Sequence, residues 1–252
     1  MIKKIIKIFL PNFIIKTREK YLIRQKLNKF SKMSMREVFS DIYLSKFWTP
    51  ENEKSSFKFY SGIGSHYDEF TKIYLQKIKK FIETFPDKPN VVDLGCGDFK
   101  IGSDLRKYCN NYIAIDIFDE LINSNKKNYK NLNVDFRTLD ITKDNLPSGD
   151  LCFLRQVLQH LSNDSILNFL KLIEGKYKYL IITEHLPDND FSPNKDIPTG
   201  PYIRLIKNSG VVLTKSPFNL NPVHEEDICN IKPKSIDRFE GIINTKILKL
   251  KK

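Results

Sequence analysis

The stretch Val91-Val92-Asp93-Leu94-Gly95-Cys96-Gly97-Asp98 decides the fold class of this 252-residue chain. A short apolar strand runs into two glycines at alternate positions, and a helix is expected from about residue 101 to 108. Glycines let the backbone turn tightly and approach a ligand closely. The N-terminus of the following helix offers free N–H groups to an anionic group. Because any α/β protein can contain such a turn, the flanking sequence has to decide what it means.

Strands and helices are expected to alternate along the chain around this stretch. Apolar residues at helical spacing predict a helix over 69–85, which Pro86 ends. Further strands are predicted at 112–117, 134–139, 151–154 and 177–183, a helix at 164–173, and candidate closing strands at 211–213 and 242–250. We therefore expect an α/β fold: a Rossmann-like, mostly parallel seven-stranded sheet with helices on both faces, plus an N-terminal helical appendage.

The positive charge of the chain is concentrated at its N-terminus. The net charge is +12, and residues 1–32 hold ten Lys or Arg and one acid, which leaves +3 for the other 220 residues. We divide the chain into a basic helical segment, 1–50, and an α/β domain, 51–252, with a loop-rich insertion near 186–230. A basic end on a nearly neutral body weakens the case for a nucleic-acid partner.

Residues 1–20 resemble a signal peptide, but Lys7 interrupts the apolar run, Pro11 breaks it, and no small-residue cleavage site follows. The run is also too short and too charged to span a bilayer. Two interpretations of residues 1–32 remain. One is a helical appendage that packs on the body or on a second subunit, as in a homodimer, which we favour. The other is a basic amphipathic segment on an anionic membrane face.

The four cysteines form no CxxC pair, and a chain of this length needs no disulfide scaffold. We interpret them as reduced thiols of a cytoplasmic protein, with the inner face of the membrane as an option for its location.

Acidic residues are expected at the ends of successive strands. Asp116 ends the second strand, about twenty residues past the glycine turn, where an acid suits the hydroxyls of a ribose. Asp140 ends the third strand, where its carboxylate can accept from an adenine amino group, and Asp150 opens the fourth. Ligands of open parallel sheets bind beyond the carboxyl ends of the strands. Acids commonly cap helices as well, but three of them in register with a glycine turn indicate one crevice.

Asp93-Leu94-Gly95-Cys96-Gly97 resembles motif I of class I S-adenosylmethionine-dependent methyltransferases, and residues 155–161 resemble the segment after the fourth strand in that family. The resemblance spans roughly residues 58–250. It implies S-adenosyl-L-methionine as cofactor and S-adenosyl-L-homocysteine as product. The residues it implies for cofactor binding are Asp93, Gly95, Cys96, Gly97, Asp116, Ile117, Asp140, Ile141, Arg155 and Gln156.

The chain departs from motif I at Phe99, which replaces the third glycine. Aromatic residues occur there in a subgroup that resembles glycan-associated methyltransferases and that also carries a Ser-Gly-x-Gly-Ser element like residues 61–65. The resemblance implies O-methylation of a sugar, nucleotide-sugar or phosphorylated intermediate of surface (capsular) polysaccharide biosynthesis. The Lys, Ile and Asn bias agrees with an AT-rich bacterial genome. A nicotinamide fingerprint needs GxGxxG, and here the third glycine is misplaced at Gly102.

Three residues are candidates for the general base that takes a proton from an acceptor hydroxyl: His185, His160 and Glu184. Histidine is the natural choice because its pKa lies near working pH, and His185 is preferred because it ends the fifth strand. His160 between Leu158 and Leu161 fits a structural role equally well. We expect Tyr202 and Arg204 to hold a small-molecule acceptor that carries a sugar or phosphate.

Two other functions stay open at this point. One is an RNA methyltransferase whose basic N-terminal arm grips phosphates. The other is a binding protein that keeps the cofactor fold without catalysis. No metal-ligand constellation is recognisable. His66 and His224 fall in predicted loops and are expected at the surface.

Overall fold

The computed structural model describes residues 12–233 and 240–251. A seven-stranded sheet with the order β3-β2-β1-β4-β5-β7-β6 forms its centre. The pairings among β1 to β5 are parallel, and β7 runs antiparallel to both β5 and β6. The strands are β1 Val91–Leu94, β2 Tyr112–Asp116, β3 Asp135–Thr138, β4 Gly149–Arg155, β5 Tyr177–Leu186, β6 His224–Ile231 and β7 Ile242–Lys249. The expected mostly parallel sheet of seven strands is confirmed.

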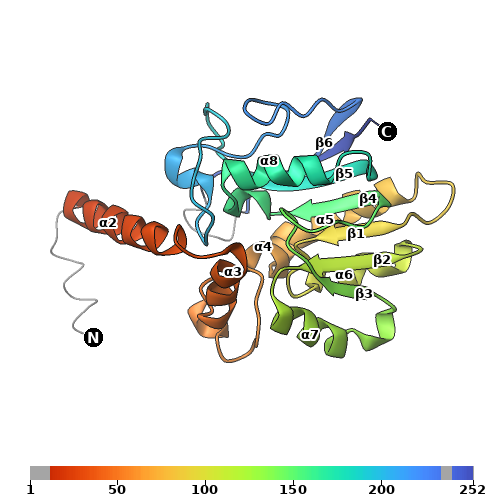
Figure 1. Ribbon diagram of the computed structural model, residues 1–252, viewed down its shortest axis with the longest axis horizontal. Coiled ribbons are helices and arrows are strands. Elements are labelled where there is room, and N and C mark those ends of the chain that lie inside the picture. Colours follow the sequence, from red (N-terminus) through yellow and green to blue (C-terminus); the bar gives the residue numbers. More distant parts are fainter. Residues whose placement is uncertain (1–11, 234–239, 252) are drawn as a thin grey trace.

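Helices cover both faces of this sheet (Figure 1). They are α2 Asn12–Phe30, α3 Met35–Leu44, α4 Ile63–His66, α5 Asp68–Ile82, α6 Lys100–Leu105, α7 Asp119–Asn128 and α8 Asn163–Leu172. The strands bury alternate residues on opposite faces, as the pleat requires. In β1, Val91 packs with α5 and α6 residues, whereas Val92 and Leu94 pack with α8 residues.

Two predictions about the last strands differ from the structure. Residues 211–213 form no strand; Val211 and Leu213 lie in a loop and are apolar because they pack into the core on the α8 face. The strand β6 was not predicted, because its sequence HEEDICNI lacks apolar alternation. It forms the edge of the sheet beside β7, where half of its residues are exposed.

The N-terminal helices behave differently from each other. α2 projects away from the sheet, at the left of Figure 1, and its apolar and charged residues are not sorted onto opposite faces. α3 packs against the body: Val38 and Ile42 bury against Phe30, and Tyr43 packs with a separate aromatic cluster. No helix in the described part of the chain is long and apolar enough to cross a membrane. The division at residue 50 stays a prediction.

Candidate active site

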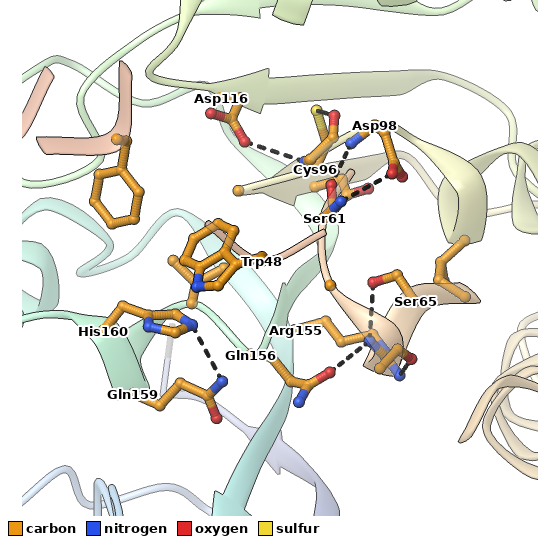
Figure 2. A pocket seen from close by; sticks show the side chains of 18 of the residues that line it. Trp48, Ser61, Ser65, Cys96, Asp98, Asp116, Arg155, Gln156, Gln159 and His160 are labelled. Atoms are coloured by element: carbon orange, nitrogen blue, oxygen red, sulfur yellow. Dashed lines mark hydrogen bonds between the residues drawn. The ribbon is translucent and has the colours of Figure 1, made fainter. Parts of the chain in front are cut away.

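A cavity of about 360 Å³ opens at the carboxyl ends of β1, β2 and β4 (Figure 2). Its walls come from the loop after β1, the segment 61–65, α3 with Trp48, and the segment 201–206. This volume is typical of a site for a small molecule. Its position agrees with the rule that ligands of open parallel sheets bind beyond the strands' carboxyl ends.

The glycine loop after β1 has a backbone that other residues rarely adopt. Gly95 and Gly97 have φ values of +75° and +56°, in the left-handed region that costs other L-residues energy. A Cβ on Gly95 would lie 2.4 Å from a methyl of Val157, and one on Gly97 would lie 2.2 Å from Oγ of Ser61. Both glycines are therefore required by the protein's own packing as well as by the turn.

Phe99, which stands in place of the third glycine of motif I, has a left-handed backbone conformation with φ +62°. Its ring is fully buried and packs edge-on against Tyr112 and Phe136, with centroids 5.4 and 4.9 Å away. Such aromatic pairs contribute beyond their buried area and offset the strained backbone. Gly102 leaves room for this ring, because a Cβ there would lie 2.2 Å from it.

The carboxylate of Asp116 lies in the cavity wall and already holds the glycine loop. It accepts from the backbone N–H of Gly97 (3.1 Å), Ile117 (2.8 Å) and Phe118 (3.3 Å). A carboxylate has about four acceptor positions, so room remains for about one further donor. Burial raises the pKa of Asp116 to about 6. The group is thus mostly ionised near neutral pH.

Asp93 and Arg155 flank the glycine loop at the ends of β1 and β4. Asp93 accepts from the hydroxyl of Tyr112 over 2.9 Å, and burial raises the pKa of Asp93 to about 7. The guanidinium of Arg155 lies 4.8 Å from the Tyr74 ring centre and donates to the carbonyl of Gly64 over 2.6 Å. Both side chains line the cavity.

Four further residues of the expected cofactor set line the cavity: Cys96, Ile117, Ile141 and Gln156. Gln156 has a φ of +56°. A non-glycine residue in this conformation is uncommon, and such residues cluster at functional sites.

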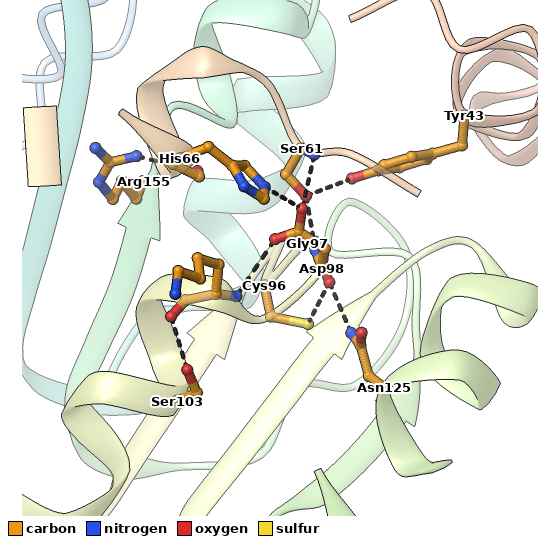
Figure 3. A network of polar contacts seen from close by, with 11 residues as sticks. Tyr43, Ser61, His66, Cys96, Gly97, Asp98, Ser103, Asn125 and Arg155 are labelled. Carbon is orange, nitrogen blue, oxygen red and sulfur yellow. Dashed lines mark hydrogen bonds and ion pairs between the residues drawn. The ribbon is translucent and has the colours of Figure 1, made fainter. Parts of the chain in front are cut away.

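The segment 61–66 packs against the glycine loop and is hydrogen-bonded to it (Figure 3). Asp98 accepts from the backbone N–H of Ser61 (3.0 Å), and its own N–H donates to Oγ of Ser61 (2.6 Å). Nε2 of His66 lies 2.6 Å from the same carboxylate. The prediction of a surface position for His66 is wrong, because its side chain is 11% exposed. His224 is exposed, as predicted.

Two of the predicted strand-end acids do not reach the cavity. Asp140 is absent from the cavity wall, although its neighbours Leu139 and Ile141 belong to it. Its carboxylate accepts from the N–H (2.9 Å) and hydroxyl (2.7 Å) of Thr142, a local turn. Asp150 lies at the amino end of β4, where it accepts from Asn90. Asp150 therefore faces the opposite edge of the sheet.

An aromatic wall, formed by Trp48, His160 and Tyr202, bounds the other end of the cavity. The rings of Trp48 and His160 have centroids 4.8 Å apart, and Nε1 of Trp48 donates to the carbonyl of Pro201 over 3.2 Å. Tyr202 stands edge-on to Phe47. Trp48 was not predicted as a site residue, since the sequence shows it only as part of a break after a helix.

The three candidate bases are not brought together. His160 lines the cavity, but burial lowers its pKa to about 4. His185 lies outside the cavity wall, with Nε2 2.6 Å from the carbonyl oxygen of Glu240, and burial lowers its pKa. Glu184 also lies outside that wall, and burial raises its pKa to about 8. A carboxyl group with that pKa is mostly protonated at neutral pH and cannot accept a proton. The structure thus does not bring His185 and Glu184 to the expected place.

Arg204 is a buried support and does not belong to the cavity wall. Its guanidinium donates to the carbonyls of Leu158 (3.0 Å) and Leu161 (2.7 Å) and to the side chain of Asn163 (2.8 Å). These bonds occupy the fork that was expected to hold an acceptor phosphate. Arg204 instead holds the turn η4, Leu158–His160, against the segment that follows β5.

The family model described as Methyltransferase domain matches residues 92–174, a third of the chain. A comparison with curated proteins finds no match. Among solved structures, the N-methyltransferase NodS from Bradyrhizobium japonicum WM9, solved with S-adenosylhomocysteine, is similar with a TM-score of 0.59 at 12% identity, covering 84% of this chain and 100% of that one. Magnesium protoporphyrin IX methyltransferase from Synechocystis PCC 6803, solved with bound S-adenosylmethionine, has a TM-score of 0.54 at 11% identity and covers 86% and 98%.

The chain has the fold of class I S-adenosylmethionine-dependent methyltransferases, and its residues 92–174 match a methyltransferase domain, which supports S-adenosylmethionine as the cofactor. The residues present fit this cofactor. Asp116 keeps acceptor capacity for a ribose hydroxyl. Asp93 and Arg155 offer a carboxyl group and a cation beside the glycine loop, where the charged amino-acid end of the cofactor needs opposite charges.

Proposed function

We propose that this enzyme transfers a methyl group to a hydroxyl of a sugar, nucleotide-sugar or phosphorylated intermediate in the synthesis of a surface polysaccharide. One observation carries the proposal: a single cavity joins the Asp116 and glycine-loop end to the aromatic wall of Trp48, His160 and Tyr202. The C–H-rich face of a sugar ring packs well on an aromatic ring. The Ser61–Ser65 element shared with glycan-associated methyltransferases supports the same acceptor class.

The bound cofactor supplies an activated methyl group on a sulfonium, so the chain needs to contribute little chemistry of its own. Asp116, Gly95 and Gly97 hold the cofactor end of the cavity, with Asp93, Arg155 and Gln156 beside them. Asp140 is proposed to act on the adenine pocket only through the turn that places Leu139 and Ile141. The aromatic wall excludes water and orients the acceptor, and alignment of the reacting atoms supplies much of the rate.

The acceptor end offers few free charges for a phosphate. Arg204 is committed to backbone carbonyls, and Arg155 donates to Gly64 and Gln156. Lys100 also lines the cavity. We therefore propose that the sugar part of the acceptor packs on Trp48 and Tyr202, and that any phosphate lies at the opening of the cavity.

The remaining partner proposals rest on the N-terminal segment. A cytoplasmic enzyme whose residues 1–32 touch the inner face of the membrane would meet lipid-linked or nucleotide-linked sugars there. A homodimer formed through the same segment is the other proposal. RNA is the alternative acceptor, because the projecting, basic helix α2 could bind its phosphates.

The test incubates the full-length protein with S-adenosylmethionine labelled in its methyl group and with candidate acceptors, and measures the transfer of the label. Separate reactions contain pooled nucleotide-sugars, pooled sugar phosphates, or bulk tRNA. We expect label in a sugar-containing product, and none with Gly97→Val protein. Label in tRNA alone would replace the sugar proposal by the RNA one. Cofactor binding by calorimetry without transfer to any pool would support a binding protein.

A further inference from the structure

Gln159 bridges the backbone of β5 and the ring of His160. Its Oε1 accepts from the backbone N–H of His185 over 3.0 Å, and its Nε2 lies 3.3 Å from Nε2 of His160. Figure 2 shows the amide nitrogen turned toward the imidazole. The side chains of Gln159 and His160 are both buried, so water does not compete freely for either hydrogen bond.

The contact with β5 fixes which way the amide of Gln159 points. A backbone N–H can only donate, so the atom that faces His185 has to be the oxygen. The reverse orientation would place two N–H donors against each other in a buried site. The amide nitrogen of Gln159 therefore faces His160, and it can only donate as well.

The orientation of this amide in turn fixes the proton on His160. Nε2 of His160 has to accept from Gln159, so it carries a lone pair. The neutral ring then holds its proton on Nδ1. Burial lowers the pKa of His160 to about 4, and the positive charge of Arg204 adds to this effect. The ring is therefore neutral near neutral pH. A protonated ring would set an N–H of Nε2 against the amide nitrogen.

Nδ1 of His160 is buried without a hydrogen-bond partner of regular geometry, and the backbone of Gly200 and Tyr202 lies close enough to the ring to raise its pKa against the effect of burial. The same segment is also tied to the turn η4, because the N–H of Gly200 donates to the carbonyl of His160 over 3.0 Å. The ring face of His160 packs on Trp48. His160 is thus packed against the segment that carries Pro201 and Tyr202, both of which line the cavity.

We propose that Gln159 fixes His160 as the neutral Nδ1–H tautomer, and that both are positioning residues of the aromatic wall, where the acceptor would bind. The acceptor role rests on the proposed function. His160 then offers no lone pair to an acceptor hydroxyl, since Nε2 is engaged by Gln159 and Nδ1 carries the proton. The hydroxyl proton leaves to solvent or to the acceptor's own groups, and the enzyme's contribution is alignment.

The test reads the tautomer directly in the full-length protein labelled with ¹⁵N-histidine. Long-range ¹H–¹⁵N correlation distinguishes a protonated from an unprotonated ring nitrogen, and the His160 signals are those missing from His160→Asn. We expect Nδ1 protonated and Nε2 unprotonated at neutral pH. The opposite pattern would overturn the proposal. This readout needs neither cofactor nor acceptor, so it stands apart from the success of the sugar assay.

Gln159→Glu tests the cause of the tautomer. A carboxylate can accept from both His185 N–H and His160, so it should move the proton of His160 to Nε2. Gln156→Glu places a new carboxylate on the same loop, at a residue without a direct bond to His160 in the described contacts, and should leave Nδ1 protonated. An unchanged tautomer in Gln159→Glu would show that the amide does not set it.

His160→Asn separates positioning from proton transfer once an acceptor is known. Asparagine keeps an N–H donor near the place of Nδ1 but has no basic nitrogen. We expect kcat to fall by less than about tenfold while KM for the acceptor rises. Loss of a general base typically costs about 10²–10⁴ in rate, so a kcat loss of that size with unchanged KM would make His160 the base.

Discussion

Asp98 and His66 meet over 2.6 Å between Oδ2 and Nε2, although they lie 32 positions apart in the chain. Through this contact the helix α4 and the segment before it hold the loop that follows β1. The same carboxylate accepts from the N–H of Ser61. The cofactor loop is therefore braced by a segment that lies outside the residues matched by the methyltransferase family model.

Breaking this brace should weaken cofactor binding without removing a direct ligand contact. We expect His66→Ala to raise the Kd for S-adenosylmethionine by about tenfold, because a lost bond to a charged group costs about 1.5–3 kcal/mol and part of that appears as loop disorder. Calorimetry measures the change. His224→Ala, on the exposed edge strand β6, is the matched control and should bind normally. Equal affinities for both variants would remove His66 from the site's support.

Asp116→Ala should cost about 2 kcal/mol of cofactor binding, or roughly thirtyfold in Kd. Its ionised carboxylate holds the glycine loop, and in the proposed site it also accepts from the ligand. Since burial raises the pKa of Asp116 to about 6, wild-type affinity should fall as the pH drops through that value. Titration calorimetry between pH 5 and 8 checks both effects. Asp140→Ala serves as comparison, and an equal loss there would give Asp140 the direct contact with adenine that its placement argues against.

Gly97→Val should abolish cofactor binding, and Gly97→Ala should already impair it. The added Cβ is strained by the positive φ and would press on Ser61 at 2.2 Å. Gly175→Ala isolates the first of these effects, because Gly175 has a φ of +68° and open space around its Cβ position. We expect Gly175→Ala to cost only about 1–2 kcal/mol of stability and no affinity. Normal binding by a folded Gly97→Val protein would reduce the motif to a turn.

Glu184→Gln should stabilise the protein at high pH and change little at low pH. Burial raises the pKa of Glu184 to about 8 in the folded state, whereas the unfolded chain releases this proton near pH 4.3. The folded state therefore holds the extra proton, and its stability falls as the pH rises between these values. Urea unfolding at pH 5 and pH 9 should show a gain on the order of a few kcal/mol at pH 9 only. The exposed Glu174→Gln is the control, and a parallel pH dependence there would contradict the assignment.

Deleting residues 1–28 should leave cofactor affinity nearly intact, because Met35 is the first of the described residues to line the cavity. A cut after residue 32 would also remove Phe30, which is 4% exposed and packs on Val38 and Ile42. Phe30→Ala in the full chain should therefore cost about 3 kcal/mol of stability. Thermal melting and calorimetry distinguish the two variants. Loss of binding in a folded 1–28 deletion would place that segment in the site.

Much of the sheet could be predicted because buried parallel strands are short apolar runs that end in turns. Val91–Leu94 was predicted to the residue, and β2 to β5 within a few residues of their observed ends. The edge strand β6 was missed for the opposite reason, since half of its residues are exposed and its sequence shows no apolar alternation. The opposite error was made at Val211 and Leu213, which were predicted as a strand. These residues are apolar because they are buried in a loop, and a short apolar run in a loop has the same pattern as a short buried strand.

The sequence by itself determined the sheet, the glycine loop and the acid at the end of β2, because these depend on local backbone geometry and short-range spacing. Only the tertiary structure decided which side chains meet. It placed Ser61 and His66 at the glycine loop and Trp48 in the aromatic wall, and left Asp140, Glu184 and His185 outside the cavity. Strand-end position gives the edge of the sheet but not the direction of a side chain. That direction is set by hydrogen bonds and packing with segments far away in the chain.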